Sequence, residues 1–154
     1  MAIRMKTVVT YRTTATSKSH SLTEIPIRDL TTLVDEPVER GGTNLGITPT
    51  ETALASLIAC TNVIGHKCAH RLGVDLGQVT IDAECDFDRR GVLMEEEIDL
   101  PFPSATLTVH CKSSATQDEL TQVGAETAKY CAIAKLFTAA GTDLTVNWVK
   151  ASET

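Results

Sequence analysis

Aromatic residues and blocks of positive charge are scarce in this chain. Its 154 residues include one tryptophan, two tyrosines and three phenylalanines, and its net charge is −6. The lysines and arginines are scattered along the sequence rather than clustered. Proteins that bind nucleic acids favour a basic face, and those that bind single strands also use aromatic side chains for base stacking. We therefore expect no nucleic-acid partner.

Long apolar runs are missing as well. A membrane span needs ~18 or more unbroken apolar residues. The longest candidate here, residues 53–65, is interrupted by a serine, a cysteine, a threonine and an asparagine. The first six residues lack the apolar core of a secretory signal. These features predict a protein that does not contact membranes and that is located in the cytoplasm.

The chain has no closely spaced pair of cysteines. Five cysteines are present, none of them in a C-x-x-C motif: Cys60, Cys68, Cys85, Cys111 and Cys131. An odd number without close pairs fits neither a secreted disulfide framework nor a zinc finger. In a reducing cytosol we expect most of these cysteines to be buried free thiols.

One histidine pair has the spacing that is typical of metal ligands. His66 and His70 are four residues apart on a predicted helix, but Lys67, Cys68 and Ala69 fill the gap. The glutamate of an H-E-x-x-H metal motif is therefore absent. We expect neither a metal site nor a bound cofactor.

The order of the predicted elements indicates an α+β fold. The apolar and charged fractions are close to those of globular proteins, and the length suits one domain over residues 1–154. Alternating patterns predict strands at residues 6–16, 20–27, 30–34, 78–87, 92–98, 105–111 and 144–149. Residues 78–111 are expected to form a meander of three antiparallel strands. Strands in runs that are separated by single helices are typical of α+β domains with mostly antiparallel sheets.

Two capping boxes mark the starts of the two predicted helices. The first helix is expected to begin after Thr48, with Glu51 at its third position, and to end at Leu72 before a glycine. The second opens at Thr116 and runs toward Gly141. The middle of the first helix is apolar on nearly all sides, so it must be buried on most of them. We therefore expect a dimer, in which the partner's helix or sheet completes this burial.

Cys60 and Cys131 lie in apolar surroundings within these two predicted helices. Free cysteine is among the most buried residue types, so residue type alone favours a small core side chain at each position. The alternative is chemical. A thiolate that attacks a peroxide becomes a sulfenic acid, and a second thiol nearby can then close a disulfide. Contact between the two cysteines requires the two helices to pack against each other.

Two charged residues are candidates for the support of such a thiolate. Glu51 is explained by its capping box, but a carboxylate there could also orient an arginine. Arg40 lies in a glycine-rich loop, residues 35–47, and could be either a solvated loop charge or the cation that lowers the pKa of Cys60. Arg12 and Arg28, both expected in strands, are rivals for that role. Glu51 and Cys60 are about 13.5 Å apart along one helix, so they cannot meet within it.

On these residues the sequence resembles the OsmC/Ohr superfamily (osmotically inducible protein C and organic hydroperoxide resistance proteins), and within it the OsmC-like branch. The resemblance covers residues 8–149. It is carried by Asp35-Glu36-Pro37, Gly41-Gly42-Thr43-Asn44, Thr48-Pro49-Thr50-Glu51, Ala59-Cys60-Thr61, Cys131 and the closing strand up to Trp148.

The resemblance implies an intertwined α+β homodimer, with antiparallel sheets packed around two long core helices and two sites at the subunit interface. It implies a thiol-dependent peroxidase that reduces organic hydroperoxides in oxidative stress defence. Cys60 would be the peroxidatic cysteine and Cys131 the resolving cysteine, and a dithiol such as a lipoylated protein would restore both. Glu51 and Arg40 would hold the thiolate and its peroxide, without a metal or cofactor.

The chain departs from the family pattern at two places. Ala132 follows the second cysteine, where many peroxidase members have proline, and Ile47 stands in the loop where a further proline is common. A second function therefore stays open: a non-catalytic dimer of the same fold that binds a small apolar ligand at the subunit interface. In that case both cysteines would be buried thiols without a chemical role.

Overall fold

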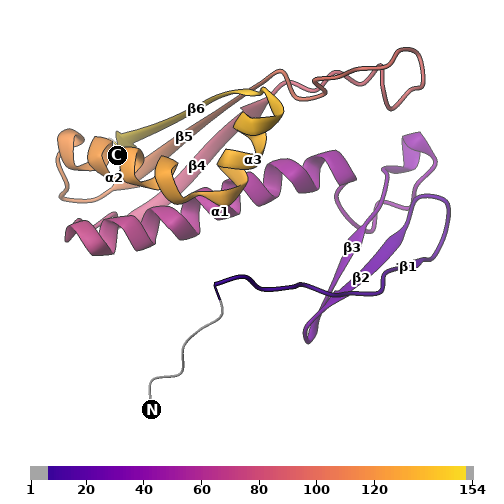
Figure 1. Cartoon of the computed structure of the whole chain (residues 1–154), viewed down its shortest axis with the longest axis horizontal. Coiled ribbons are helices and arrows are strands. Elements are labelled where there is room, and N and C mark those ends of the chain that lie inside the picture. Colours follow the sequence, from indigo (N-terminus) through magenta and orange to yellow (C-terminus); the bar gives the residue numbers. More distant parts are fainter. Residues whose placement is uncertain (1–6, 152–154) are drawn as a thin grey trace. The chain divides into compact units, whose positions relative to one another are not determined.

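The computed structural model describes residues 7–151. The chain divides into two compact units, with the boundary between Ala53 and Leu54, and Figure 1 shows the elements of each. The α+β class expected from the sequence is confirmed, because each unit contains a sheet and the helices follow the predicted order. The single domain over residues 1–154 stays a prediction.

The first unit contains a small antiparallel sheet of three strands. Strand β1 spans Thr16–Ser17, β2 spans Thr23–Ile27 and β3 spans Leu30–Val34, in the order β1-β2-β3. Of the strand predicted over residues 6–16, residue 6 lies outside the described residues and Thr16 belongs to β1. The prediction is wrong for residues 7–15, which are exposed and are not assigned to a strand. Alternation in the sequence shows only that a chain can extend. A strand also needs a neighbour that shares its backbone hydrogen bonds.

A structured loop leads from β3 to the first helix. It contains one 3₁₀ turn, η1 (Val38–Arg40), which ends at Gly41 in a left-handed conformation with φ 85°. At Gly42 a side chain would collide with the chain itself, since a Cβ atom there would lie 1.8 Å from the carbonyl oxygen of Glu36. The glycines of this loop are therefore required by its close folding.

Helix α1 (Pro49–Leu72) begins and ends where the sequence predicts. Its capping box is formed: the Thr48 N–H donates to Glu51 Oε2 at 2.7 Å, and the Glu51 N–H donates to Thr48 Oγ1 at 3.2 Å. Buried residues on α1 follow helical spacing and form one stripe: Leu57, Thr61, Gly65, Cys68 and Ala69.

The second unit contains a mixed sheet with the order β4-β5-β6. Strand β4 spans Gln78–Cys85, β5 spans Ser104–Lys112 and β6 spans Asp143–Lys150. Strands β4 and β5 pair antiparallel, whereas β5 and β6 pair parallel. The predicted three-stranded meander is therefore wrong, because the third strand of this sheet comes from the end of the chain.

The predicted strand at residues 92–98 is a turn-rich loop instead. The Arg90 side chain pairs with Asp88 and with Glu96, which draws the two ends of the loop together. Met94 has a φ of 58°, a conformation that interrupts an extended chain. Three consecutive glutamates follow, so there is no apolar alternation that a sheet face could bury.

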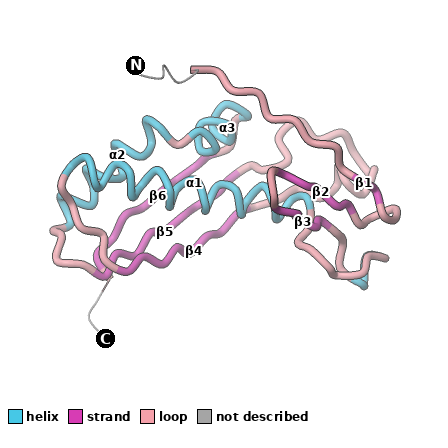
Figure 2. The backbone as a smooth tube through the Cα atoms, turned by 90° about the horizontal axis from the view of Figure 1, so that it is seen from below, coloured by secondary structure: helices cyan, strands magenta, loops and turns pink. Residues whose placement is uncertain are grey.

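Helices α1, α2 and α3 lie on one face of this sheet (Figures 1 and 2). Helix α2 (Gln117–Tyr130) begins at the predicted capping box of Thr116 and Glu119, and α3 (Ala132–Ala140) ends at Gly141. The sequence predicted one helix here, and the structure breaks it at Cys131, whose ψ of 105° is extended.

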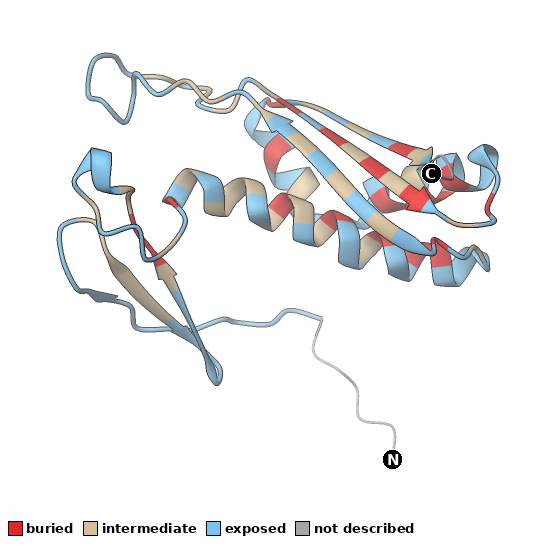
Figure 3. Ribbon diagram, turned by 180° about the vertical axis from the view of Figure 1, so that it is seen from behind, coloured by how far each residue is buried: buried red, intermediate tan, exposed pale blue. Residues whose placement is uncertain are grey.

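The core of the second unit lies between the sheet and the helices, where Figure 3 shows the buried residues. Alternate residues of β5 point inward and are fully or nearly fully buried: Ala105, Leu107, Val109 and Cys111. Val109 and Cys111 share one core cluster with Leu120 and Val123 of α2, which are 0% exposed. The opposite side of α1 stays open, since Val63 is 49% exposed. Within residues 7–151, no helix is both long enough and apolar enough to cross a membrane.

Candidate thiol site

Two of the five cysteines are in contact in the second unit. The thiols of Cys60 on α1 and Cys131 between α2 and α3 are close neighbours, and both are free thiols. Cys131 is 1% exposed, whereas Cys60 is half-buried. The structure thus brings together the two cysteines that the sequence singled out, although they are far apart in the chain.

The break between α2 and α3 determines the surroundings of Cys131. Its N–H donates to the Thr127 carbonyl at 2.9 Å, and its own carbonyl accepts from the Lys135 N–H at 3.1 Å. Cys131 therefore ends one helix and begins the next, with its thiol at the N-terminus of α3. Such a position favours a thiolate, because the first N–H groups of a helix carry partial positive charge.

Opposing effects act on the Cys131 thiol. Burial raises the pKa of Cys131 most strongly, and the nearby N–H of Ala134 lowers it. The contact with Cys60 raises the pKa of Cys131 further, because two neighbouring thiols resist a second negative charge, and the Thr61 hydroxyl lowers it. The net result is a raised pKa, so Cys131 is held as a neutral thiol at neutral pH.

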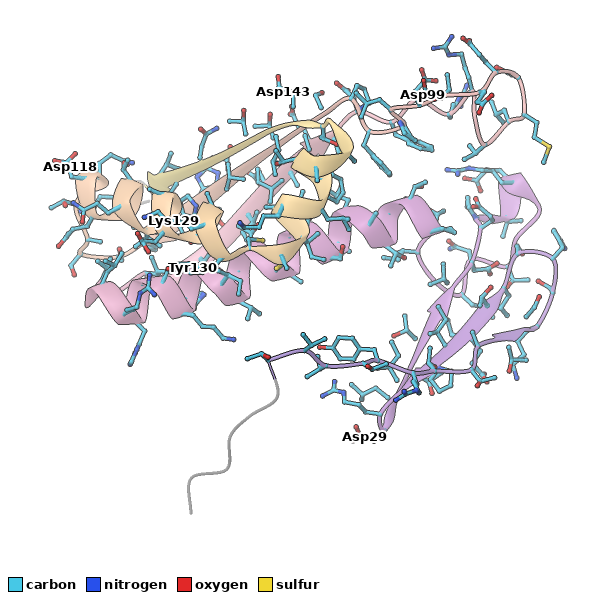
Figure 4. All side chains as sticks on the ribbon, in the orientation of Figure 1. Asp29, Asp99, Asp118, Lys129, Tyr130 and Asp143 are labelled. Atoms are coloured by element: carbon cyan, nitrogen blue, oxygen red, sulfur yellow. The ribbon has the colours of Figure 1, made fainter. Side chains whose placement is uncertain are left out.

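A charged cluster at the surface joins α1 to α2 just before this break. Lys129 and Tyr130 lie at the C-terminal end of α2 (Figure 4). Arg71 lies over the Tyr130 ring, 4.9 Å from its centre, and also pairs with Glu126. Glu126 pairs with Lys129 as well. These contacts connect the helix that carries Cys60 to the helix that ends at Cys131.

Glu51 and Arg40 are electrostatic neighbours in the first unit. The pKa of Glu51 is lowered mainly by the Thr48 N–H and hydroxyl, and the Arg40 charge lowers it further. The direct partner of Arg40 is a different carboxylate: its guanidinium lies 3.1 Å from Glu36 Oε2, and its side chain is 61% exposed. The two rival arginines are not in strands as expected, because Arg12 lies in the exposed segment before β1 and Arg28 lies in the turn between β2 and β3.

Asp35 holds the loop that carries Arg40, although the sequence indicated it only as part of the family resemblance and gave it no role. It is fully buried and accepts hydrogen bonds from the Glu36 N–H, the Thr43 N–H and hydroxyl, and the Leu45 N–H, at 2.6–3.2 Å. These donors, with the Thr43 hydroxyl first, hold the pKa of Asp35 far below its usual range. The sequence feature that could have identified this role is the aspartate at the start of a glycine-rich loop.

A cavity of about 460 Å³ lies beside Cys131 in the second unit. Its lining comes from α1, α2, α3 and β6: Thr61, Gly124, Thr127, Ala128, Cys131, Ala134, Lys135, Thr138, Ala139, Leu144, Val146 and Trp148. Sequence reasoning missed it, because it depends on how the helices pack over β6.

Trp148 lines this cavity and needs small residues around it. A Cβ atom at Gly65 would lie 2.2 Å from its ring, and one at Gly124 would lie 2.6 Å away. Glycine on α1 and on α2 therefore makes room for the indole. Among the described residues, the buried Trp148 Nε1–H has no hydrogen-bond acceptor.

His66 belongs to the histidine pair that has the spacing of metal ligands. The His66 ring contacts the Asn62 carbonyl at 3.0 Å, one helical turn away. Over residues 7–151, no three histidine, cysteine, aspartate or glutamate side chains are grouped so that they could hold a metal ion.

The chain belongs to the OsmC-like protein family. The sequence profile of that family, described as "OsmC: OsmC-like protein", matches residues 42–147, which is more than half of the chain. This segment contains Glu51, Cys60 and Cys131 and leaves Arg40 outside. The sequence has no match among curated proteins.

Solved structures share the fold over nearly the whole chain. An OsmC-like protein from Mycoplasma pneumoniae has a TM-score of 0.78 at 14% identity, covering 94% of this chain and 99% of its own. An organic hydroperoxide resistance protein OsmC from Legionella pneumophila has a TM-score of 0.68 at 17% identity, covering 93% and 98%. The organic hydroperoxide resistance protein OhrB of Bacillus subtilis has a TM-score of 0.63 at 18% identity, covering 92% and 98%. At these identities the likeness establishes the fold.

Proposed function

We propose that this protein is a thiol-dependent peroxidase that reduces organic hydroperoxides and serves in oxidative stress defence in the cytoplasm. The observation that carries the proposal is the contact between the Cys60 and Cys131 thiols. Two neighbouring cysteines can exchange a sulfenic acid for a disulfide without a large rearrangement. Membership of the OsmC-like family and the hydroperoxide-resistance proteins among its structural neighbours support the same role.

Cys60 is the peroxidatic cysteine in this proposal, because it is the more accessible of the two. Its thiolate attacks the terminal oxygen of R–O–O–H, the O–O bond breaks, and the alkoxide leaves as the alcohol after protonation. Cys60 becomes a sulfenic acid. Cys131 is held neutral by its raised pKa, so it does not compete for the peroxide.

Cys131 is the resolving cysteine. Its sulfur attacks the Cys60 sulfenic acid, an S–S bond forms, and water leaves with the thiol proton. The first N–H groups of α3 stabilise negative charge on the Cys131 sulfur during this step. A dithiol reductant, such as a lipoylated protein, then returns both cysteines to the thiol state while it is itself oxidised to a disulfide.

Arg40 and Glu51 complete the proposed site in a homodimer. The Cys60 thiolate needs a cation, because burial alone favours the neutral thiol. Arg40 is the proposed cation, with Glu51 as the carboxylate that orients it, since the two are electrostatic neighbours. Glu51 cannot reach Cys60 along its own helix, and this favours a site to which two subunits contribute.

The test is the intact mass and free-thiol count after one equivalent of cumene hydroperoxide, without reductant. We expect the loss of two hydrogens and a peptide that joins Cys60 to Cys131 after digestion. The Cys60→Ser variant should consume no peroxide, and Cys68→Ser, a buried thiol outside the pair, is the matched control. An unchanged mass with five free thiols would instead support the non-catalytic dimer that binds a small apolar ligand.

A further inference from the structure

We infer that the reductant uses the cavity beside Cys131 and attacks the Cys131 sulfur, so that reductant and peroxide reach the cysteine pair by different routes. This inference rests on the proposed function and concerns its second half-reaction. Among the described residues that line the cavity, Cys131 is the only cysteine. Cys60 is half-buried on α1 and does not line it.

The size of the cavity suits an alkyl dithiol rather than a folded protein surface. Its volume of about 460 Å³ lies within the range of ~300–1,000 Å³ that is common for small-molecule sites. A reductant that is a large protein would therefore present its dithiol on an extended arm. A bulky, strongly charged monothiol fits less well, because much of the wall is apolar.

The cavity wall has an apolar part and a part with hydrogen-bond donors. Leu144 and Val146 of β6 and Ala139 of α3 supply apolar surface for an alkyl chain. Lys135 also lines the cavity, and within residues 7–151 the buried N–H of Trp148 has no acceptor. A carbonyl or carboxylate oxygen of the reductant would find a donor there. The cavity thus matches a dithiol on a short alkyl chain that ends in an oxygen acceptor.

Attack at Cys131 gives a balanced and productive reduction. A thiolate of the reductant bonds to the Cys131 sulfur, the Cys60–Cys131 bond breaks, and Cys60 leaves as a thiolate, ready for the next peroxide. The second thiol of the reductant loses its proton and attacks the reductant's own first sulfur. Cys131 then leaves as a thiolate at the N-terminus of α3 and takes up that proton, and the reductant departs as a cyclic disulfide.

The route can be tested by filling the cavity. Ala128 of α2 lines it, and Ala125 lies on the same helix, is exposed and does not line it. Ala128→Leu should slow reduction of the oxidised protein by dihydrolipoamide at least tenfold, whereas Ala125→Leu should leave that rate unchanged. The rate of disulfide formation with cumene hydroperoxide serves as the reference for each variant. Equal rates of reduction for the two variants, or equal slowing of both half-reactions by Ala128→Leu, would overturn the inference.

A second experiment identifies directly which cysteine sulfur the reductant attacks. The pair is oxidised with diamide, which needs no peroxidase activity, and then treated with 6-mercaptohexanamide, an alkyl monothiol that cannot complete the second step. Quenching with N-ethylmaleimide and peptide mass spectrometry should find the mixed disulfide on Cys131 and the maleimide on Cys60. The reverse pattern would refute the inference. A protein that forms this adduct but is not oxidised by peroxide would refute the proposed function alone.

Discussion

Asp35 accepts four hydrogen bonds within the loop that carries Arg40, and its carboxylate is fully buried. Three of its donors come from Thr43 and Leu45, so Asp35 ties the far side of the loop to the end of β3. Arg40 lies between these two points. At the scale of single residues, the position of the proposed cation thus depends on a carboxylate that does not take part in the chemistry.

Asp35→Asn is expected to lower the melting temperature at neutral pH on the order of 5 °C, because charge-assisted hydrogen bonds to a buried carboxylate are lost. The pKa of Asp35 in the folded chain lies far below its usual range. Its stabilising effect is therefore present above the ordinary aspartate pKa of about 3.9 and is lost as the pH falls further. Thermal unfolding followed by circular dichroism should show the two melting temperatures converging below about pH 4. A constant difference down to pH 2 would contradict this account.

Arg40→Ala is expected to slow the oxidation of Cys60 by cumene hydroperoxide on the order of 10–100-fold at neutral pH, because a cation that stabilises the thiolate and the leaving oxygen is removed. Arg12→Ala and Arg28→Ala are the controls, since both arginines are exposed. Single-turnover kinetics of thiol loss measures each rate. If one of the controls slows the reaction and Arg40→Ala does not, the assignment of the cation is wrong.

At the scale of elements, the break at Cys131 is the feature that creates the thiol site. An uninterrupted helix would not give Cys131 the N-terminal N–H groups of α3. Its φ of −69° and ψ of 105° also lie outside the α region, which a following proline disfavours. The local turn is therefore compatible with the proline that many peroxidase members carry, although this chain has Ala132.

Ala132→Pro is accordingly expected to be tolerated or to stabilise the protein by about 0.4–1 kcal/mol, because position 132 is the first residue of α3 and proline restricts the unfolded chain. Leu136→Pro is the matched change inside the same helix, at an exposed residue, and should cost about 3 kcal/mol. Urea unfolding of both variants gives the comparison. A loss above 2 kcal/mol for Ala132→Pro would show that this turn needs a backbone N–H at position 132.

The elements that could be predicted from the sequence are those with local signals. The capping boxes at Thr48 and Thr116 correctly mark the starts of α1 and α2, because their contacts span only three residues. The parallel pairing of β6 with β5 has no local signal, and it was missed. The break at Cys131 was missed too, since neither glycine nor proline marks it.

In the candidate site, too, features with a local sequence signal were predicted and features that depend on the fold were not. Cys60, Cys131, Glu51 and Arg40 were predicted from residue type and context and stay predictions as site residues, and the contact between the cysteines was left open. The Glu36 partner of Arg40, the Asp35 anchor and the cavity below α2 and α3 depend on how the loop and helices fold back. The spacing of residues in the sequence does not predict these contacts.

At the scale of the whole molecule, one face of α1 remains uncovered by the residues that the structure describes. Ala55, Ala59 and Val63 follow one another at intervals of four residues and are all exposed. Small and apolar side chains in such a stripe allow another helix to approach closely. The homodimer expected from the sequence stays a prediction, and this face of α1 is where we expect the second subunit to pack.

The purified protein should therefore migrate as a species of about twice its chain mass of 16.6 kDa, as measured by light scattering after size exclusion. Val63→Glu places a charge in the middle of the uncovered face and should shift this species toward the monomer, because an unpaired charge is costly to bury. Val92→Glu is the matched control, at an exposed valine in the loop between β4 and β5. If the proposed site needs two subunits, Val63→Glu should also slow the peroxide step in proportion to the monomer fraction, and this slowing should diminish as protein concentration rises. A Val63→Glu protein that is monomeric yet fully active at every concentration would show that a single chain holds the complete site.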